Sequence, residues 1–154
     1  MSTKPVIAIL GGTGDLGSGL AKRWLAAGYP IIIGSRSADK ARAFAKDLGE
    51  GARGEDNIGA ARAGDIVVLA VPFASHEATL LEVKDSVQGK IVVDAAVPLV
   101  PPKVSVVQLP PEGSAAQIAQ NLDAIESFDF GVQIAAAHTD FREVFAEIFR
   151  HPLG

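Results

Sequence analysis

Three glycines with the spacing G-x-G-x-x-G, Gly12, Gly14 and Gly17, are the first residues whose pattern indicates chemistry. They follow a short apolar run and open a segment of helical period, which is the context of a dinucleotide-binding loop. The first glycine permits a tight turn, the second lets the backbone approach a pyrophosphate, and the third lets helix and strand pack closely. The free N–H groups at the helix start favour the phosphates. We therefore expect five residues to bind a dinucleotide: Gly12, Thr13, Gly14, Asp15 and Leu16. The alternative is a glycine turn that binds no ligand.

A group of phosphate-binding side chains follows the second predicted strand: Ser35, Arg36 and, one helical turn later, Lys40. NAD sites place an acidic residue at the end of this strand to hold the ribose 2′-hydroxyl, and none stands there in this sequence. A hydroxyl, a guanidinium and an ammonium can instead bind a 2′-phosphate, and Arg36 can also lie over the adenine. The sequence therefore favours NADP. The alternatives are a solvated helix start for Arg36 and Lys40 and a plain helix cap for Ser37.

A third candidate segment, Ala70, Val71 and Pro72, ends a later apolar run. In a doubly wound sheet the carboxyl ends of the strands line the ligand crevice. We therefore expect these residues beside the pyrophosphate and the nicotinamide ribose of the cofactor. Pro72 would fix the backbone there, or it could equally be a simple strand terminator.

The other polar side chains exclude several reactions. Tyr29, the single tyrosine, is followed by Pro-Ile-Ile-Ile and offers no Tyr-x-x-x-Lys pair, so an atypical short-chain reductase ranks last. The histidines His76, His138 and His151 show neither metal-binding spacing nor a nucleophile context, and we expect His76 and His151 on the surface. We predict no catalytic side chain and no metal site. Hydride transfer between two bound cofactors needs only that the donor and acceptor carbons are held close, so we expect an oxidoreductase of that type.

Short runs rich in Val and Ile alternate with segments of helical period, which is typical of an α/β, Rossmann-like doubly wound parallel sheet. We expect a single domain over residues 1–154 with about six strands, at 6–10, 31–34, 51–54, 66–71, 91–94 and 132–136. The first helix should carry Leu16, Leu20, Trp24 and Leu25 on one face and end at Gly28. Further helices are expected at 38–48, 57–63, 75–87, 114–122 and 140–150.

Two segments near the carboxyl end are of special interest. Residues 96–113 hold Pro98, Pro101, Pro102, Pro110 and Pro111, so this segment cannot be a helix and should form a long ordered loop or a flap. The last predicted helix carries an apolar stripe of residues 141, 144, 145, 148 and 149, which indicates core packing or, alternatively, a dimer surface.

Composition excludes other classes of protein. The formal net charge of -4 argues against nucleic acid as a partner, and no apolar run is long enough for a membrane span or has the form of a signal peptide. The chain has no cysteine, so redox chemistry requires a bound cofactor. We expect a cytoplasmic protein whose partner is a small-molecule redox acceptor, and a homodimer.

Several motifs in the same order resemble the F420-dependent NADP reductase family. The resemblance covers roughly residues 5–122 and rests on residues 11–17 (GGTGDLG), 33–36 (IGSR), Lys40, 71–73 (VPF), 92–94 (VVD) and 113–116 (GSAA). It implies that residues 13–16, Ser35, Arg36 and Lys40 bind NADP and that the deazaflavin F420 is the second redox partner. His138 and Thr139 are similar to the family's pair beside the deazaflavin ring.

Members of this family continue into a small C-terminal domain that completes the F420 pocket, whereas this sequence ends at Gly154. The resemblance therefore leaves open a truncated paralogue, a partner subunit that supplies the missing wall, or another acceptor such as a flavin or a ferric chelate. It also leaves a second function, a non-catalytic NADP(H)-binding or sensor module.

Overall fold

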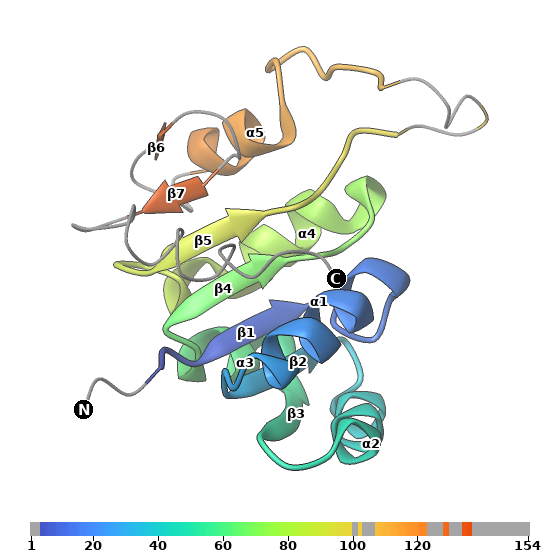
Figure 1. Ribbon diagram of the computed structural model, residues 1–154. Helices are drawn as coiled ribbons and strands as arrows, with labels where there is room; N and C mark the ends of the chain where they lie inside the picture. Colours follow the sequence, from blue (N-terminus) through green and yellow to red (C-terminus); the bar gives the residue numbers. More distant parts are fainter. Residues whose placement is uncertain (1–3, 100–101, 103–106, 123–127, 130–133, 137–154) are drawn as a thin grey trace.

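The computed structural model describes residues 4–99, 102, 107–122, 128–129 and 134–136. These residues form a sheet of seven strands in the order β3-β2-β1-β4-β5-β7-β6, with helices on both faces (Figure 1). The strands are β1 (Ile7–Leu10), β2 (Ile31–Ser35), β3 (Ala52–Asp56), β4 (Ile66–Leu69), β5 (Ile91–Asp94), β6 (Phe128–Asp129) and β7 (Ile134–Ala136). The helices are α1 (Asp15–Ala26), α2 (Ala38–Leu48), α3 (Asn57–Ala63), α4 (Phe73–Val83) and α5 (Ala115–Asn121), with a 3₁₀ turn η1 (Lys84–Ser86).

The sheet is wound in both directions from its centre. β1 pairs in parallel with β2 and with β4, so that Ile7 lies opposite both Ile31 and Ile66. The chain first builds outward through β2 to β3 and then returns to the other side of β1 to form β4 and β5. The point between β1 and β4 is where the strand order reverses, and ligands of doubly wound folds bind outside the strand ends at such a point.

Two apolar cores, one on each face of the sheet, hold these layers together. Alternate residues of β1 enter opposite cores: Ile7 and Ile9 pack with Trp24 of α1, whereas Ala8 and Leu10 pack with helices α3, α4 and α5. Helices α1 and α2 therefore cover one face and α3, α4 and α5 the other. Because both faces are covered, the central strands are apolar throughout, as is usual in parallel sheets.

The predicted α/β doubly wound fold is confirmed, with two differences in the sheet. The strand predicted at 51–54 is present as β3, and the first five strands are parallel. The strand predicted at 132–136 is present as β7, but it pairs antiparallel with β5, and β6 pairs antiparallel with β7. The helix predicted at 140–150 lies outside the described residues.

Two boundaries around the third candidate segment were predicted wrongly. The strand predicted over 66–71 ends at Leu69, and α4 begins at Phe73 rather than at 75. The chain leaves the sheet here because Pro72, which has no N–H for a strand ladder, is the N-cap residue of α4. Residues 70–72 are therefore a connection outside the sheet.

The face predicted for the first helix is partly wrong. Two of its apolar residues differ in burial. Trp24 is buried, whereas Leu16, which lies in the first turn of the helix, is 51% exposed. The buried small residues Gly17 and Ala21 share the inner face with Trp24. Gly28 follows the helix with a φ of 83°, as its predicted role at the helix end requires.

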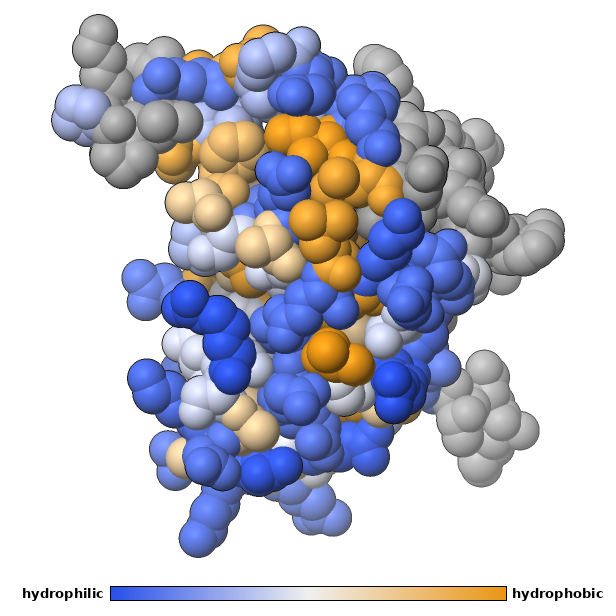
Figure 2. Space-filling model, turned by 180° about the vertical axis from the view of Figure 1, so that it is seen from behind, coloured by the Kyte–Doolittle hydropathy of each residue, from blue (hydrophilic) through white to orange (hydrophobic). Residues whose placement is uncertain are grey.

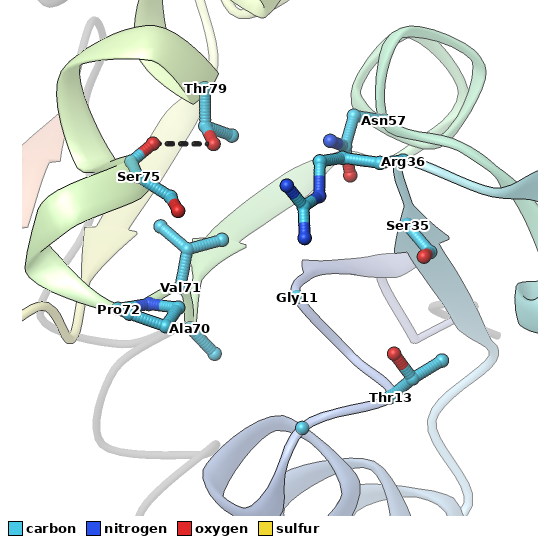
Figure 3. A pocket seen from close by; sticks show the side chains of 11 residues that line it. Gly11, Thr13, Ser35, Arg36, Asn57, Ala70, Val71, Pro72, Ser75 and Thr79 are labelled. Atoms are coloured by element: carbon cyan, nitrogen blue, oxygen red, sulfur yellow. Dashed lines mark hydrogen bonds between the residues drawn. The ribbon is translucent and has the colours of Figure 1, made fainter.

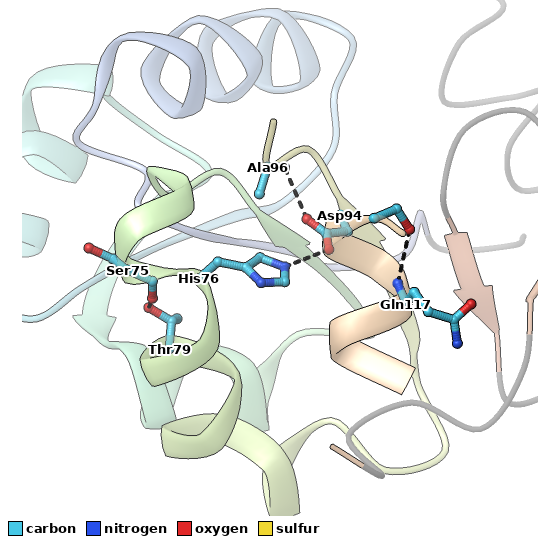
Figure 4. A network of polar contacts seen from close by, with 7 residues as sticks. Ser75, His76, Thr79, Asp94, Ala96 and Gln117 are labelled. Carbon is cyan, nitrogen blue, oxygen red and sulfur yellow. Dashed lines mark hydrogen bonds and ion pairs between the residues drawn. The ribbon is translucent and has the colours of Figure 1, made fainter. Parts of the chain in front are cut away.

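His76 was predicted on the surface, and the structure contradicts this. Its side chain is 1% exposed, and its Nε2 lies 2.6 Å from Oδ2 of Asp94 at the end of β5 (Figure 4). The other carboxylate oxygen of Asp94 accepts a hydrogen bond from the backbone N–H of Ala96. The ring of Phe73 stacks on the imidazole with centroids 6.1 Å apart. The pair thus fixes the start of α4 to the end of β5.

The proline-rich segment 96–113 contains no helix among its described residues and extends from the end of β5 as an arm (Figure 1). Leu99 and Val107 form an antiparallel bridge. The described residues on either side of this bridge include four exposed apolar side chains. These are Val97, Leu99, Val107 and Leu109, which are 40–71% exposed.

Lys90 holds the end of α3 in place. Its ammonium donates to three backbone carbonyl oxygens, those of Ala61, Arg62 and Gly64, at 2.7–2.8 Å. Burial lowers the pKa of Lys90, and the nearby carboxylate of Asp65 opposes this shift. None of the helices in the described part of the chain has both the length and the apolarity needed to cross a membrane.

Candidate functional site

A cavity of about 240 Å³ lies at the carboxyl ends of β1, β2 and β4, at the point where the strand order reverses (Figure 3). It is lined from four directions: by the β1–α1 loop, by the end of β2, by the β4–α4 connection and by helices α3 and α4. The lining residues are Gly11, Thr13, Gly14, Ser35, Arg36, Asn57, Ala70, Val71, Pro72, Ser75 and Thr79.

The β1–α1 loop turns at Gly11, one residue before the predicted motif. Gly11 has a φ of 75°, and a Cβ at this position would lie 2.6 Å from the carbonyl oxygen of Ala70. Its N–H and that of Gly12 both donate to the carbonyl oxygen of Gly34, which ties the loop to β2. A side chain on Gly12 would meet the core instead, with Ile33 3.0 Å away. The tight turn expected at Gly12 is therefore made at Gly11.

The other two motif glycines bring the start of α1 to the cavity. A Cβ on Gly17 would collide with the carbonyl oxygen of Gly11 and would lie 2.8 Å from Cα of Gly12, so only glycine lets the helix approach the loop this closely. Gly14 is the N-cap residue of α1 and lines the cavity, and no side chain caps the helix there. The first N–H groups of a helix have no partner within the helix. They are available to an anion at this end of α1.

The end of β2 contributes Ser35 and Arg36. The guanidinium of Arg36 points across the cavity toward α4, and the Ser35 hydroxyl lies on the same side as Thr13 (Figure 3). Ser37 caps α2, because its Oγ accepts from the N–H of Lys40 at 3.4 Å. No acidic side chain lines the cavity, and Arg36 is its single charged lining residue among the described residues.

The opposite wall consists of polar residues that the sequence patterns did not indicate: Asn57, Ser75 and Thr79. Asn57 is the first residue of α3 and 2% exposed, and Thr79 donates its hydroxyl to the carbonyl oxygen of Ser75 at 2.8 Å. One signal could have identified Asn57. It follows directly on a strand, and polar residues at the carboxyl ends of strands face the crevice of doubly wound sheets.

The cavity brings together most, but not all, of the predicted site. Seven of the predicted residues line it: Thr13, Gly14, Ser35, Arg36, Ala70, Val71 and Pro72. Four others lie nearby in the chain without being part of the lining: Gly12, Asp15, Leu16 and Lys40. His138 lies outside the described residues. Within the described part of the chain, no group of three or more His, Cys, Asp or Glu could hold a metal ion.

This geometry can be compared with known proteins. The model of the family described as "NADP oxidoreductase coenzyme F420-dependent" matches residues 6–98, from β1 to the root of the arm. The chain belongs to this family. The match contains the glycine loop, the end of β2, Asn57 and the α4 wall, so the whole lining of the cavity lies within the family's part of the chain.

Relatives in this F420-dependent family support the assignment. The F420-dependent NADP reductase of Methanocaldococcus jannaschii is 42% identical over 128 residues, which cover 75% of this chain and 57% of that protein. The protein of the same name from Methanothermobacter marburgensis is 44% identical over 100 residues, or 60% of this chain and 45% of that protein. The chain thus spans about half the length of these relatives.

A solved structure shows the same fold at lower identity. It is described as a putative F420-dependent NADP-reductase from Arthrobacter sp. FB24, with a TM-score of 0.65 and 26% identity. The superposition covers 76% of this chain and 57% of that one.

Proposed function

We propose that the cavity binds NADP(H). The glycine loop would bind the pyrophosphate through residues 12–16, and Ser35 and Arg36, with Lys40 from α2, would bind the 2′-phosphate. Residues 70–72 would lie beside the pyrophosphate and the nicotinamide ribose. The observation that supports this most strongly is the presence of Arg36 and the absence of any carboxylate in the described lining of a cavity that also contains the glycine loop. A carboxylate at the end of β2 would repel a 2′-phosphate, whereas a guanidinium can pair with it.

The residues fit this cofactor in shape as well as in charge. Backbone atoms approach so closely around Gly11 and Gly17 that neither position could accommodate a Cβ. Because no side chain caps α1, its first main-chain N–H groups are available to the phosphates. The lining also combines one cation with apolar side chains such as Val71, as a site for a charged ligand with an aromatic base requires.

We further propose that the protein takes part in hydride transfer between NADP(H) and a second redox cofactor, F420. The names of its relatives support this acceptor. NADP(H) is one of the two hydride carriers in such a reaction, which runs in either direction. The described residues that line the cavity include no histidine, cysteine or carboxylate, so their part is to bind and orient the nucleotide. His138 stays a prediction for the side of the second cofactor.

The activity can be tested by mixing the protein with NADPH and F420 and following the deazaflavin absorbance. Turnover that depends on both cofactors supports the reductase. NADPH binding without turnover at micromolar protein would exclude F420 reduction by this chain and would favour the second candidate, a non-catalytic NADP(H)-binding module. A flavin and a ferric chelate, assayed in parallel, test whether the acceptor differs.

We also propose that the chain forms a homodimer through the exposed face of the arm. Viewed from behind, apolar surface gathers in the half of the molecule that carries the arm, while the half with β3 and α2 is mostly hydrophilic (Figure 2). The arm's exposed apolar side chains include Leu99 and Val107, which form an isolated antiparallel bridge, and an apolar surface of this kind can pack on its own copy about a two-fold axis. Sedimentation velocity tests this. The wild type should sediment as a dimer and Leu109→Glu, a change at a 71% exposed side chain, as a monomer. A monomeric wild type contradicts it.

A further inference from the structure

The cavity is too small for a whole dinucleotide. Its volume of about 240 Å³ lies below the roughly 300–1,000 Å³ of pockets for drug-sized ligands, and NADP(H) is larger than such a ligand. Arg36, the one cation that the described lining contains, pairs with a 2′-phosphate, which is carried by the adenosine half of the cofactor. The cavity therefore fits the adenosine half, and the nicotinamide half has to lie outside its lining.

The glycine loop determines where the rest of the cofactor continues. Helices α3 and α4, which line the cavity, cover one face of the sheet, and α1 covers the other. Figure 3 shows Asn57 and Thr79 on one side of Gly11, and Thr13, in the loop that leads to α1, on the other. Doubly wound sheets bind the two halves of a dinucleotide on either side of the point where the strand order reverses. A pyrophosphate at Gly14, the N-cap residue of α1, therefore leads the nicotinamide half to the α1 face, beside β4.

Leu16 is an apolar side chain on that side of α1. It is separated by nine residues, or about two and a half helical turns, from Leu25, so the two side chains lie on opposite sides of the helix. Leu25 faces β3, because a Cβ on Gly51, directly before β3, would be 3.0 Å from its Cδ1. The strand order is β3-β2-β1-β4, so the side of α1 that carries Leu16 faces β4.

The position of Leu16, more than its exposure, indicates contact with a ligand. A single exposed leucine is ordinary on a protein surface. Leu16, however, lies in the first turn of α1, two residues after Gly14, which lines the cavity. It directly precedes Gly17, whose lack of a side chain lets this turn approach the loop. An apolar ring placed here would cover surface of a side chain that is 51% exposed in the ligand-free chain.

We propose that the side chain of Leu16 packs against one face of the nicotinamide ring and so holds the ring beside the start of α1. The inference rests on the proposed binding of NADP(H). The reduced ring carries no charge, so its contact with a leucine requires no charged group to lose its water. Leu16 covers one face of the ring, and the opposite face is left for the second redox cofactor.

The test compares NADPH with 2′-phospho-ADP-ribose, which has the same adenosine half, pyrophosphate and second ribose but no nicotinamide. Isothermal titration calorimetry without any hydride acceptor measures both dissociation constants. The wild type should bind NADPH at least about tenfold more tightly. In Leu16→Ala this ratio should fall at least about threefold, because part of the apolar contact is lost, while 2′-phospho-ADP-ribose binds within about twofold of its wild-type affinity.

Two further variants serve as controls. Leu81→Ala changes a leucine of nearly the same exposure, 53%, on α4 outside the cavity lining, and should keep the wild-type ratio. Leu16→Met keeps an apolar side chain of similar volume and should keep the ratio within about twofold. A Leu16→Met ratio as low as that of Leu16→Ala would contradict the apolar contact.

The ratio separates contact with the ring from a purely structural role. If Leu16 only stabilises the start of α1, its truncation weakens both ligands alike and leaves the ratio unchanged, and this result would overturn the inference. Equal binding of the two ligands by the wild type overturns it as well, while the proposal of NADP(H) binding stands. Failure to bind either ligand overturns both. Should Leu16→Ala not fold, Leu16→Gln, of similar length but polar, provides the same comparison with the same expected fall.

Discussion

The two walls of the cavity differ in how they are built. The loop wall, Gly11, Thr13, Gly14, Ser35 and Arg36, consists of residues that directly follow two neighbouring strands, and its shape is a matter of local backbone geometry. The helix wall, Asn57, Ser75 and Thr79, is assembled from two helices that meet only in the folded chain. The comparison teaches that the phosphate-binding loop and the packing of α3 against α4 have separate structural origins. It predicts that they can be changed independently.

The largest expected effect concerns the support of the helix wall. His76→Leu would leave the buried carboxylate of Asp94 without its partner at 2.6 Å. Breaking a buried pair in this way costs about 3–5 kcal/mol, so the free energy of unfolding in urea should fall by that amount. NADPH binding to the folded fraction should stay close to that of the wild type, because neither residue lines the cavity.

The double variant His76→Leu/Asp94→Leu is the control for this prediction. It removes the unpaired charge and should recover more than half of the lost stability. A single variant as stable as the wild type would show that the pair contributes nothing. A large loss of NADPH affinity in a folded single variant would show that the two walls are not independent.

In the loop wall the largest effect is expected at Arg36. Arg36→Asp removes a charge-assisted contact worth about 1.5–3 kcal/mol, so NADPH should bind roughly 10- to 100-fold more weakly. NADH, which lacks the 2′-phosphate, should be much less affected. Arg42→Ala is the matched control, since Arg42 pairs with Asp39 on the surface of α2 outside the cavity lining. A loss of less than threefold for NADPH in Arg36→Asp would refute the 2′-phosphate contact.

Two glycines of α1 provide a comparison within one helix. Gly17→Ala forces a methyl group against the Gly11–Gly12 backbone and should lower the free energy of unfolding by about 1–3 kcal/mol. Gly19→Ala has no atom within 4 Å of the new Cβ and should instead stabilise the helix by about 0.5–1 kcal/mol. Urea unfolding measures both. Equal effects of the two substitutions would mean that the close approach of α1 to the loop is unimportant.

The smallest effect is expected for Lys40→Ala. Lys40 is exposed and lies outside the cavity lining, so its contribution to 2′-phosphate binding is screened by water. NADPH affinity at physiological salt should fall by no more than about threefold. A loss as large as that of Arg36→Asp would place the 2′-phosphate nearer to α2 than the cavity suggests.

Patterns along the chain predict the loop wall and much of the fold. Helix α2 and strand β5 lie where their periodicity and composition indicate, at Ala38–Leu48 and Ile91–Asp94. The glycine spacing and the Ser35–Arg36 pair are also local, and they lie together because β1 and β2 are neighbours. In such cases the residues that determine the structure are adjacent in the sequence.

Contacts between distant segments could not be predicted in this way. The sequence shows His76 only as a polar residue near a helix start, and its burial depends on Asp94, 18 residues later on β5. The role of Asn57 likewise depends on Glu82, which fixes its amide. The sequence also did not indicate that β7 pairs antiparallel with β5.

The central claim is that the loop wall selects the 2′-phosphate of NADP(H). The most direct test is to measure the dissociation constants of NADPH and NADH for the wild-type protein under one salt condition by isothermal titration calorimetry. The account predicts that NADPH binds at least about tenfold more tightly, as expected for one charge-assisted contact at Arg36. Equal affinity for the two cofactors, or tighter binding of NADH, would contradict it.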